Sequence, residues 1–451
     1  MTVLVAERPG AGEPRPFRFP AFSRHAVAGG TVLACHLERR PIVSLSLVSR
    51  SGAAAEPSGA EGVANLTAQL LGQGAGGLDA HAFAVAGERL GASWFAAVGW
   101  DATQLGFDVP SAAVPAAAEL LHHALASPTL DAEELGRLRD ERLDDLMADA
   151  ARPRTRALRE LAAALWRSGS RYSLPQAGHA AGVSAVDIEA VRQWHDTRLL
   201  PGCAALVIAG DLTGLDIEAV GATVFSGWSG GAGEAAGTTS EPVQGGRRVV
   251  VVHRPGAVQS ALAVGHSGPA RGGEDEVALT TMQMALGGTF SSRLNYTLRE
   301  KKGYTYGASA QYDLRRDAGI FVAQSEVKTE VTAPALTDAF AEITGMHDGG
   351  IRADELDDVR RQRIERYPLA FASPRGVAGA LSEIVVYDLP DDYYDRQRER
   401  IAAVTKEEVD AAGRRHLRLD DLVTVVVGDA DVVAEGLGDL GLGPVEVRAD
   451  E

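Results

Sequence analysis

Two strand-like segments each occur twice in this chain, about half a chain length apart. Residues 44–52 (SLSLVSRSG) recur as residues 261–268 (ALAVGHSG), and their final glycines lie 216 positions apart. Residues 204–211 (AALVIAGD) recur as residues 422–429 (LVTVVVGD) at an offset of 218. Because two independent matches share nearly one spacing, they indicate an internal duplication and predict two similar domains.

The segment between the two copies is typical of a linker. Residues 228–240 (WSGGAGEAAGTTS) are rich in Gly and Ser and show no apolar periodicity. We therefore expect a first domain over residues 1–227, a flexible linker over 228–243 and a second domain over 244–451.

Helices and strands mix within each half. The repeated segments alternate apolar and small polar residues, as half-buried strands do. Before the last strand of each half, residues 184–187 (SAVD) and 405–408 (TKEE) match a capping box at a helix start. Long helical patterns cover residues 131–165 and 353–366. The predicted class is α+β, with two similar domains, each a mostly antiparallel sheet with helices packed on it.

Composition excludes several classes of protein. The chain has 451 residues, 45% of them hydrophobic, which is enough for two or more packed domains. Its net charge of −17 argues against a nucleic-acid or membrane partner. No apolar run reaches a membrane-spanning length and no signal peptide is evident, so we expect a cytoplasmic location. Cys35 and Cys203, the only cysteines, are expected to be ordinary buried thiols.

Residues 61–72 (EGVANLTAQLLG) predict an amphipathic helix that follows the first strand and turn. Its apolar positions, Val63, Leu66, Leu70 and Leu71, fall on an inward face. Taken alone, this pattern requires nothing more than packing against a core.

The same segment resembles the inverted zinc motif of the pitrilysin/insulinase family, Gly-(Val/Leu)-Ala-His-x-x-Glu-His. In that motif two His on one helix face bind zinc, and the Glu activates the metal-bound water. Here the two His positions are Asn65 and Gln69, and the Glu position is Ala68. Carboxamides are weak zinc donors and a methyl group takes no proton, so the motif is degenerate.

The resemblance also implies a third ligand, a Glu on a later helix. By its place eight residues before Pro153, that position corresponds to Asp145. A lone carboxylate makes no zinc site, and His36, His122, His123 and His253 offer no alternative ligand spacing. We expect this chain to hold no metal and no cofactor.

The second half keeps its family motif, whereas the zinc motif of the first half is degenerate. Residues 286–307 (LGGTFSSRLNYTLREKKGYTYG) are similar to the family's second-half signature over its full length. The resemblance implies that Arg299 and Tyr306 reach toward a peptide held at a zinc site, where they donate to a carbonyl or an oxyanion. Arg293 and Glu300 are expected to hold the helix and loop in place.

A third family feature is an edge strand that pairs with bound peptide. Its counterpart is residues 91–98 (GASWFAAV), with Ala92, Ser93 and Trp94 as the candidate pairing positions. The aromatic rings of Trp94 and Phe95 are themselves expected to belong to the core.

The resemblance implies half of a clam-like chamber. It is closest to the half-length bacterial type, the non-zinc subunit of processing-peptidase-like pairs, in which one chain bears the zinc motif and the other the Arg/Tyr pair. It predicts that this chain binds peptide substrate and works with a homologous subunit that carries the intact inverted zinc motif and the zinc. Two alternatives stay open, a non-enzymatic scaffold or binding module of the same fold and a subunit dedicated to maturation of one precursor peptide.

Overall fold

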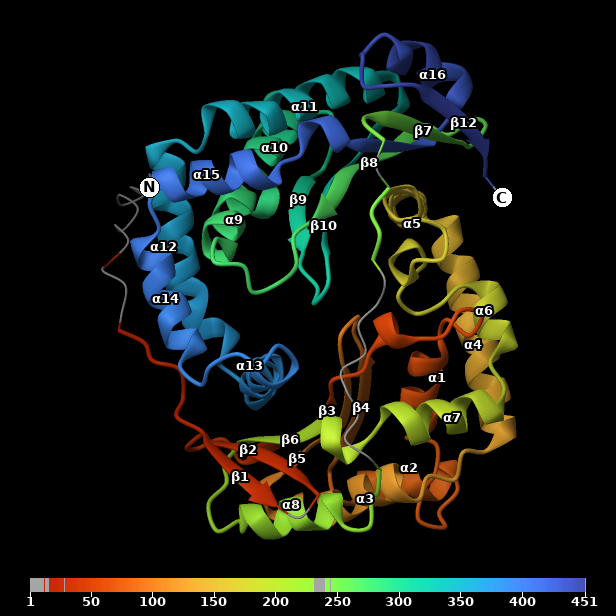
Figure 1. The fold of residues 1–451 in the computed structure, drawn as a ribbon, viewed down its shortest axis with the longest axis vertical. Coiled ribbons are helices and arrows are strands. Elements are labelled where there is room, and N and C mark those ends of the chain that lie inside the picture. The colour runs from red at the N-terminus through yellow and green to blue at the C-terminus, as the bar shows by residue number, and fades with distance from the viewer. Residues whose placement is uncertain (1–11, 13–15, 28, 231–239, 244, 451) are drawn as a thin grey trace, which may run out of the picture.

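Two six-stranded sheets form the frame of the molecule (Figure 1). The computed structural model describes residues 12, 16–27, 29–230, 240–243 and 245–450. The first sheet contains β1 (Ser23–Val27), β2 (Gly30–His36), β3 (Ile42–Ser49), β4 (Ser93–Val98), β5 (Thr103–Pro110) and β6 (Ala204–Gly210). The second contains β7 (Arg248–His253), β8 (Gln259–Gly268), β9 (Ala308–Asp313), β10 (Gly319–Lys328), β11 (Val423–Gly428) and β12 (Val445–Ala449).

The strand order confirms the duplication. The first sheet runs β1-β2-β6-β3-β5-β4 and the second runs β12-β7-β11-β8-β10-β9, so five strands follow the same order in both. In the first sheet β3, β5 and β4 pair antiparallel, and β2 pairs parallel with β6. In the second sheet β8, β10 and β9 likewise pair antiparallel, and β7 pairs parallel with β11. The sheets differ only at one edge, because β1 is antiparallel to β2 whereas β12 is parallel to β7.

Helices surround both sheets, as the α+β prediction required. Those of the first half are α1 (Val63–Leu70), α2 (Ala80–Arg89), α3 (Val114–Ala126), α4 (Ala132–Ala151), α5 (Pro153–Leu165), α6 (Ala180–Ala185), α7 (Ile188–Arg198) and α8 (Ile217–Phe225). Those of the second half are α9 (Glu276–Gln283), α10 (Arg293–Asn295), α11 (Thr332–Gly349), α12 (Ala353–Ala370), α13 (Pro374–Val386), α14 (Tyr393–Ala403), α15 (Lys406–His416) and α16 (Ala430–Gly438).

Each half sends one helix to the sheet of the other half. Helix α5 packs on β8 and β11 of the second sheet, and Leu161 lies there in one buried cluster with Val250 and Val425. Helix α13 packs on β3 and β6 of the first sheet, where Leu381 shares a cluster with Val207. Each sheet is therefore built from the strands of one half, whereas one of the helices that cover it, α5 or α13, comes from the other half.

Two local expectations were wrong. The helical pattern over residues 131–165 forms two helices, because Pro153 cannot donate the backbone hydrogen bond that a continuous helix needs. Residues 184–187 form no capping box: Asp187 itself caps α7, and its side chain accepts a hydrogen bond from Ala190 N. The box at Thr405 is confirmed at the start of α15.

Other expectations are confirmed or fall outside the described residues. The two thiols are free and buried, and burial raises the pKa of Cys35 to about 11. The predicted linker over 228–243 falls mostly on residues 231–239, which are not described. Its end is anchored, since Val243 N donates to Leu165 O at 2.8 Å.

No single described helix combines the length and apolar composition needed to cross a membrane. Helices α12 and α13 reach that length and composition only together, and the pair is bent by 107°.

Candidate functional site

Helix α1 carries the degenerate motif and packs as its sequence predicts. Gly62 precedes it with a φ of 112°, a left-handed conformation that favours glycine, and an added Cβ there would lie 2.8 Å from Val183. Asn65 and Gln69 are partly exposed on one face, one turn apart, as the i and i+4 positions require. Ala68 is only 1% exposed and belongs to the core of the first half.

The start of α1 is fixed by a buried ion pair. Glu56 accepts hydrogen bonds from Arg171 at 3.0 and 2.6 Å and from Ala64 N at 2.9 Å. Arg171 also donates to the carbonyls of Pro175 and Gln176, at 2.8 and 2.7 Å. Burial raises the pKa of Glu56, and the charge and hydrogen bonds of Arg171 oppose that rise. Both charges are out of water, so loss of either residue would leave the other charge buried without a partner.

Asp145, the candidate third ligand, lies on α4 with its side chain 73% exposed. Its carboxylate forms an ion pair with Arg142 at 3.7 Å. Among the described residues, no group of three His, Cys, Asp or Glu ligands gathers around α1. Asn65, Gln69 and Asp145 therefore do not fit a zinc ion, in agreement with the chemistry of their side chains.

One group in the described chain has metal-like spacing, and it has a structural explanation. His253, Asp429 and Asp431 place one ligand atom each within 4.8 Å of the others. However, His253 Nδ1 accepts a hydrogen bond from Ala430 N at 3.0 Å. Asp429 caps α16 and also accepts from Gly256 N at 2.8 Å. These atoms are thus engaged in holding a helix start against the end of β7.

The first half repeats that arrangement. His36, at the end of β2, accepts through Nδ1 from Leu212 N at 3.0 Å, and its ring lies 3.8 Å from Asp211. His253 and Asp429 lie at the same 3.8 Å in the second half. Since the duplication preserves the pair at both strand ends, we assign it to the fold.

The second-half signature folds into an irregular helical segment. It includes two π-helical turns, η5 (Met284–Gly288) and η6 (Tyr296–Lys301), on either side of the short α10. Gly287 lies so close to β9 that an added Cβ would sit 2.2 Å from Ala310 N. Single π-helical turns are often found at functional sites. The sequence predicted a helix and a loop in this segment but not π-helical turns.

Arg293 has the structural role that was predicted for it. Its guanidinium donates to both carboxylate oxygens of Glu355, at 2.8 and 2.7 Å, and to Gly350 O at 2.7 Å. This buried two-point contact ties α10 to the start of α12. Glu300 lies beside Arg299 instead, with its Oε1 3.4 Å from the Arg299 Nε.

Arg299 and Tyr306 both present polar groups at the surface. The Arg299 guanidinium lies over the ring of Phe290, 4.6 Å from its centroid, and the side chain is partly exposed. Phe290 is itself exposed, which is unusual for so large an apolar side chain. Tyr306 is 93% exposed, in the turn that precedes β9.

A pocket of about 450 Å³ opens beside Tyr306. It is lined by polar side chains of the second sheet, such as Gln324 and Ser309, and by Arg154 from α5 of the first half. Arg154 Nε donates to Gln324 Oε1 at 3.1 Å. The pocket thus combines hydrogen-bonding groups from both halves next to an exposed phenol.

Asn295 is a site residue that the sequence analysis missed. It is 5% exposed, between the buried Leu294 and the η6 turn. Its side chain donates to Phe290 O at 2.6 Å and accepts from Ala308 N at 3.2 Å. The sequence offers only a weak signal, a carboxamide beside buried apolar residues, which is usually hydrogen-bonded but whose partners the sequence does not show.

The predicted edge strand is confirmed as β4, which pairs with β5 at the edge of the first sheet. Trp94 packs its ring against Phe107 at 5.1 Å, and the next residue, Phe95, lies under Arg375 at 4.3 Å. Ala92 just precedes the strand, and Ser93 begins it with an exposed side chain. Strand β4 has no partner strand along its outer edge in the described structure.

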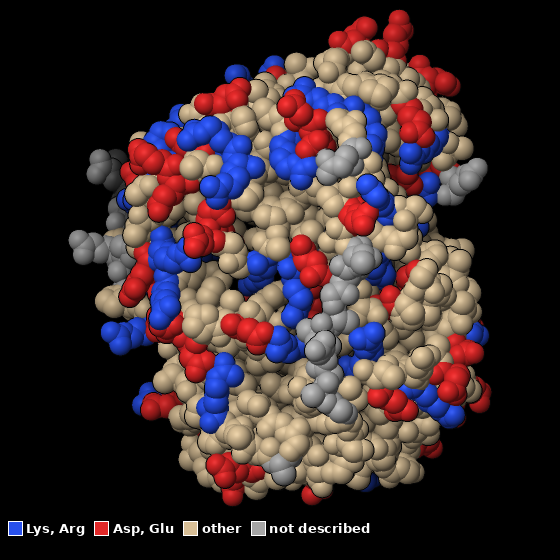
Figure 2. Space-filling view, in the orientation of Figure 1, with Lys and Arg blue, Asp and Glu red and all other residues tan. Residues whose placement is uncertain are grey.

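Residues of both halves also meet near the centre. Figure 2 shows the surface hollowed near the middle of this face, with charged side chains of both signs around it. A pocket of about 510 Å³ lies between the β4–β5 turn, the β9–β10 turn and α13. There the Arg315 guanidinium lies over the rings of both Trp100 and Tyr172, at 4.3 and 4.6 Å, and pairs with Asp313 at 2.7 Å. These contacts join the halves.

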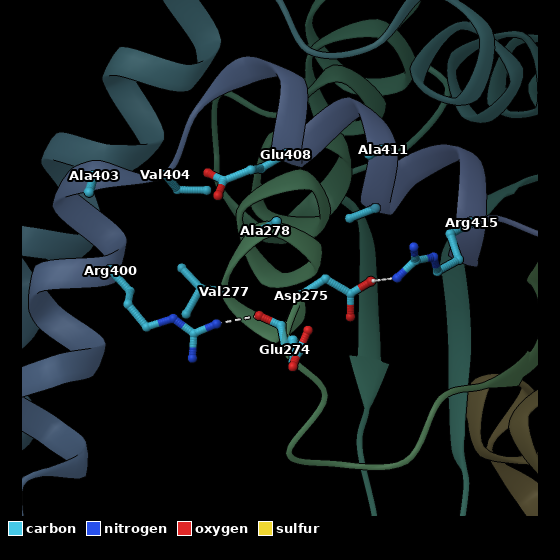
Figure 3. A pocket seen from close by; sticks show the side chains of 11 residues that line it. Glu274, Asp275, Val277, Ala278, Arg400, Ala403, Val404, Glu408, Ala411 and Arg415 are labelled. Carbon is cyan, nitrogen blue, oxygen red and sulfur yellow. Dashed lines mark hydrogen bonds and ion pairs between the residues drawn. The ribbon is translucent and has the colours of Figure 1, made fainter.

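A further pocket, of about 400 Å³, lies among α9, α14 and α15 (Figure 3). Its charged side chains are engaged with one another and with backbone, since Arg415 pairs with Asp275 at 3.1 Å and Arg400 donates to Glu274 O. The residues that line it include none of the predicted site positions.

Comparison with known proteins identifies the family. Residues 31–175 match the family described as insulinase (peptidase family M16), and residues 185–363 match the peptidase M16 inactive domain. The chain is 28% identical over 197 residues to an uncharacterized zinc protease of Mycobacterium tuberculosis, across 43% of this chain and 40% of that protein. It is 26% identical over 212 residues to the zinc protease PqqE of Helicobacter pylori, across 46% and 48%. The chain therefore spans less than half the length of these two relatives.

Solved structures match along nearly the whole chain. The peptidase M16 inactive domain from Pseudomonas fluorescens has a TM-score of 0.84 and 25% identity, covering 91% of this chain and 98% of that one. A protease from Helicobacter pylori has the same TM-score of 0.84 at 19% identity, covering 91% and 100%, and shows the shared fold. Together with the repeated sheets and the signature around Arg299, these matches establish that the chain belongs to the pitrilysin/insulinase family, peptidase family M16.

Proposed function

We propose that this chain is the subunit without zinc in a two-chain metallopeptidase. In this hypothesis it binds peptide and presents Arg299 and Tyr306 to a reaction that takes place at the zinc of a homologous partner. Membership of the M16 family and the match to the inactive domain over residues 185–363 support a peptidase-family role. The pairing with a zinc-bearing chain goes beyond those matches.

One contrast carries the proposal. Helix α1 offers Asn65, Ala68 and Gln69 where zinc chemistry needs two His and a Glu, so this helix cannot hold a zinc ion that activates water. The signature segment, by contrast, keeps the Arg299 side chain partly exposed and Tyr306 exposed beside a polar pocket. A guanidinium and a phenol so placed have no catalytic use within the chain, and they suit a reaction centre supplied from outside it.

The chemistry of the two side chains fits stabilisation of charge. Zinc held by the partner would polarise the peptide carbonyl and activate water. Arg299 would donate to the oxygen on which negative charge develops, and the Tyr306 hydroxyl would donate alongside it. The ring of Phe290 beneath the guanidinium limits its motion, and the Nε lies 3.4 Å from Glu300 Oε1.

Peptide binding in the proposal uses the edge of β4. An extended peptide would add a strand beside residues 92–94 through main-chain hydrogen bonds, with little dependence on its sequence. Trp94 would support that edge by packing against Phe107 on the core face of β4, and Phe95 lies on the opposite face under Arg375.

The test is reconstitution with a homologous chain that carries the intact inverted zinc motif. We expect a heterodimer that cleaves peptides which neither chain cleaves alone. Arg299→Ala or Tyr306→Phe should lower kcat about 10²-fold, the scale for loss of an oxyanion donor, and leave assembly intact. Arg299→Lys should also be impaired, since an ammonium lacks the planar fork of donors.

Matched controls lie in the same segment. Lys301→Ala removes an exposed cation from η6, and Tyr296→Phe removes an exposed hydroxyl, so both should leave kcat within about twofold of the unmodified pair. Full activity in both Arg299→Ala and Tyr306→Phe would refute the proposed role of this segment. Assembly is checked by light scattering for every variant.

A further inference from the structure

Asn295 uses both ends of its side-chain amide to join two separate loops. The amide nitrogen donates to Phe290 O at 2.6 Å, and the amide oxygen accepts from Ala308 N at 3.2 Å. At 5% exposure the side chain has little water to replace either partner. A buried amide that loses one of these contacts would leave an unpaired polar group.

Each loop carries one part of the surface described above. The first loop, residues 289–292, contains Phe290, whose ring lies under the Arg299 guanidinium at 4.6 Å. The second begins β9 at Ala308, two residues after Tyr306. One amide therefore sets the separation between the ring that supports Arg299 and the turn that supports Tyr306.

The turn around Tyr306 is held from its other side as well. Thr305 Oγ1 donates to Gly307 O at 2.9 Å, and Ser325 Oγ donates to the same oxygen at 3.1 Å. The carbonyl of Gly307 is thus fixed to β10, and the following N–H, on Ala308, is fixed to Asn295. The backbone that carries the exposed phenol is therefore anchored although its side chain is free.

We propose that Asn295 is a positioning residue, which sets the distance between Arg299 and Tyr306 for a shared substrate. The proposal rests on the function proposed above. It adds that the pair acts as one unit, because a single buried amide holds both supports. A shift of about 1 Å between two groups that contact one substrate can cost on the order of 10²-fold in rate.

The sharpest perturbation is Asn295→Asp. The substitution keeps size and shape, and the carboxylate can still accept from Ala308 N. It cannot donate to Phe290 O, and it places a charged oxygen opposite that carbonyl. Asn295→Ser removes both hydrogen bonds of the amide without adding a charge. It keeps the test interpretable if the Asp variant folds poorly. Gln283→Glu is the control, since Gln283 Oε1 only accepts, from Tyr312 N at 3.3 Å.

The experiment measures kcat, KM and melting temperature for the reconstituted pair. We expect Asn295→Asp and Asn295→Ser to lower kcat at least tenfold, a loss of the size that misplacement causes, while Gln283→Glu stays within about twofold. In a chain that already carries Arg299→Ala and Tyr306→Phe, either Asn295 change should lower kcat no further. A side chain that only stabilised the fold would lower the melting temperature in both backgrounds and would not show this dependence on Arg299 and Tyr306.

The outcomes separate the two proposals. If Arg299→Ala lowers kcat and both Asn295 variants retain full kcat, the role of Asn295 is refuted and the proposed function stands. If the losses at Asn295 and at Arg299 multiply independently, the positioning role is also refuted. If Arg299→Ala and Tyr306→Phe retain full kcat, the proposed function fails and the inference about Asn295 fails with it.

Discussion

Restoring the catalytic Glu of the inverted zinc motif should destabilise this protein. Ala68 is 1% exposed and lies in the core cluster that also holds Leu71 and Phe107. Ala68→Glu would add a methylene and a carboxylate where the present packing leaves the methyl group almost no exposed surface. Both the added volume and the added charge oppose folding.

The expected cost follows from these two contributions. Overpacking a core position costs about 1–3 kcal/mol. If burial raises the pKa of the new carboxyl by about two units, ionisation adds about 3 kcal/mol at pH 8, at 1.36 kcal/mol per unit. A raised folded-state pKa gives no penalty below the unfolded value of about 4.3, and the penalty grows as pH rises. We therefore expect a loss of about 5 kcal/mol at pH 8 and about 3 kcal/mol at pH 5.

Urea denaturation followed by circular dichroism at pH 5 and pH 8 measures both contributions. Ala68→Gln reports the steric part, because it has nearly the same volume without the charge. Gln69→Glu is the control on the adjacent, partly exposed position, and should change the free energy of unfolding by less than about 0.5 kcal/mol. Equal stability of Ala68→Glu and the unmodified chain at pH 8 would refute the reasoning. So would robust zinc-dependent cleavage by a chain with Asn65→His, Ala68→Glu and Gln69→His.

Three further predictions follow from the contacts. The purified chain should hold no stoichiometric zinc by metal analysis, and one zinc per chain would contradict the reading of α1. Arg171→Ala should lower the free energy of unfolding by about 3–5 kcal/mol in urea denaturation, because it leaves the buried Glu56 charge without a partner. Arg137→Ala, in an exposed pair, should lower it by less than about 1 kcal/mol. Burial lowers the pKa of His266 to about 4. The unfolded chain, with a histidine pKa of about 6.5, therefore takes up this proton at a higher pH than the folded chain does. The free energy of unfolding should thus be about 2 kcal/mol lower at pH 5 than above pH ~6.5. That fall should be smaller in His266→Gln, and an unchanged pH profile would exclude this histidine as its source.

Local patterns in the sequence predicted local structure well. The repeated segments are β3, β8, β6 and β11, and the inward face of α1 is the one that its apolar spacing indicated. These features depend on neighbours within a few residues, which a periodic pattern records. The edge position of β4 was predicted through the family resemblance, since nothing in its own residues states what lies beside it.

Long-range features were not accessible in the same way. Strand order, the parallel pairs and the exchange of α5 and α13 depend on contacts between distant parts of the chain. Residues 184–187 matched a capping box because the pattern uses residue types alone, and Asp187 offered the better cap. Asn295 was missed because its value lies in two backbone partners, five residues before it and thirteen after it.

The exchange of α5 and α13 has a consequence for how the protein is made. The face of the first sheet formed by β3 and β6 is complete when Gly210 has been synthesised, but its cover, α13, ends only at Val386. At the usual rates of translation that interval lasts roughly 10–35 s. During that interval the nascent first half exposes apolar side chains that are buried in the finished protein, including Leu33, Val48 and Val207. We therefore expect the first half, when expressed alone, to keep this face uncovered and to be more prone to aggregation than the whole chain.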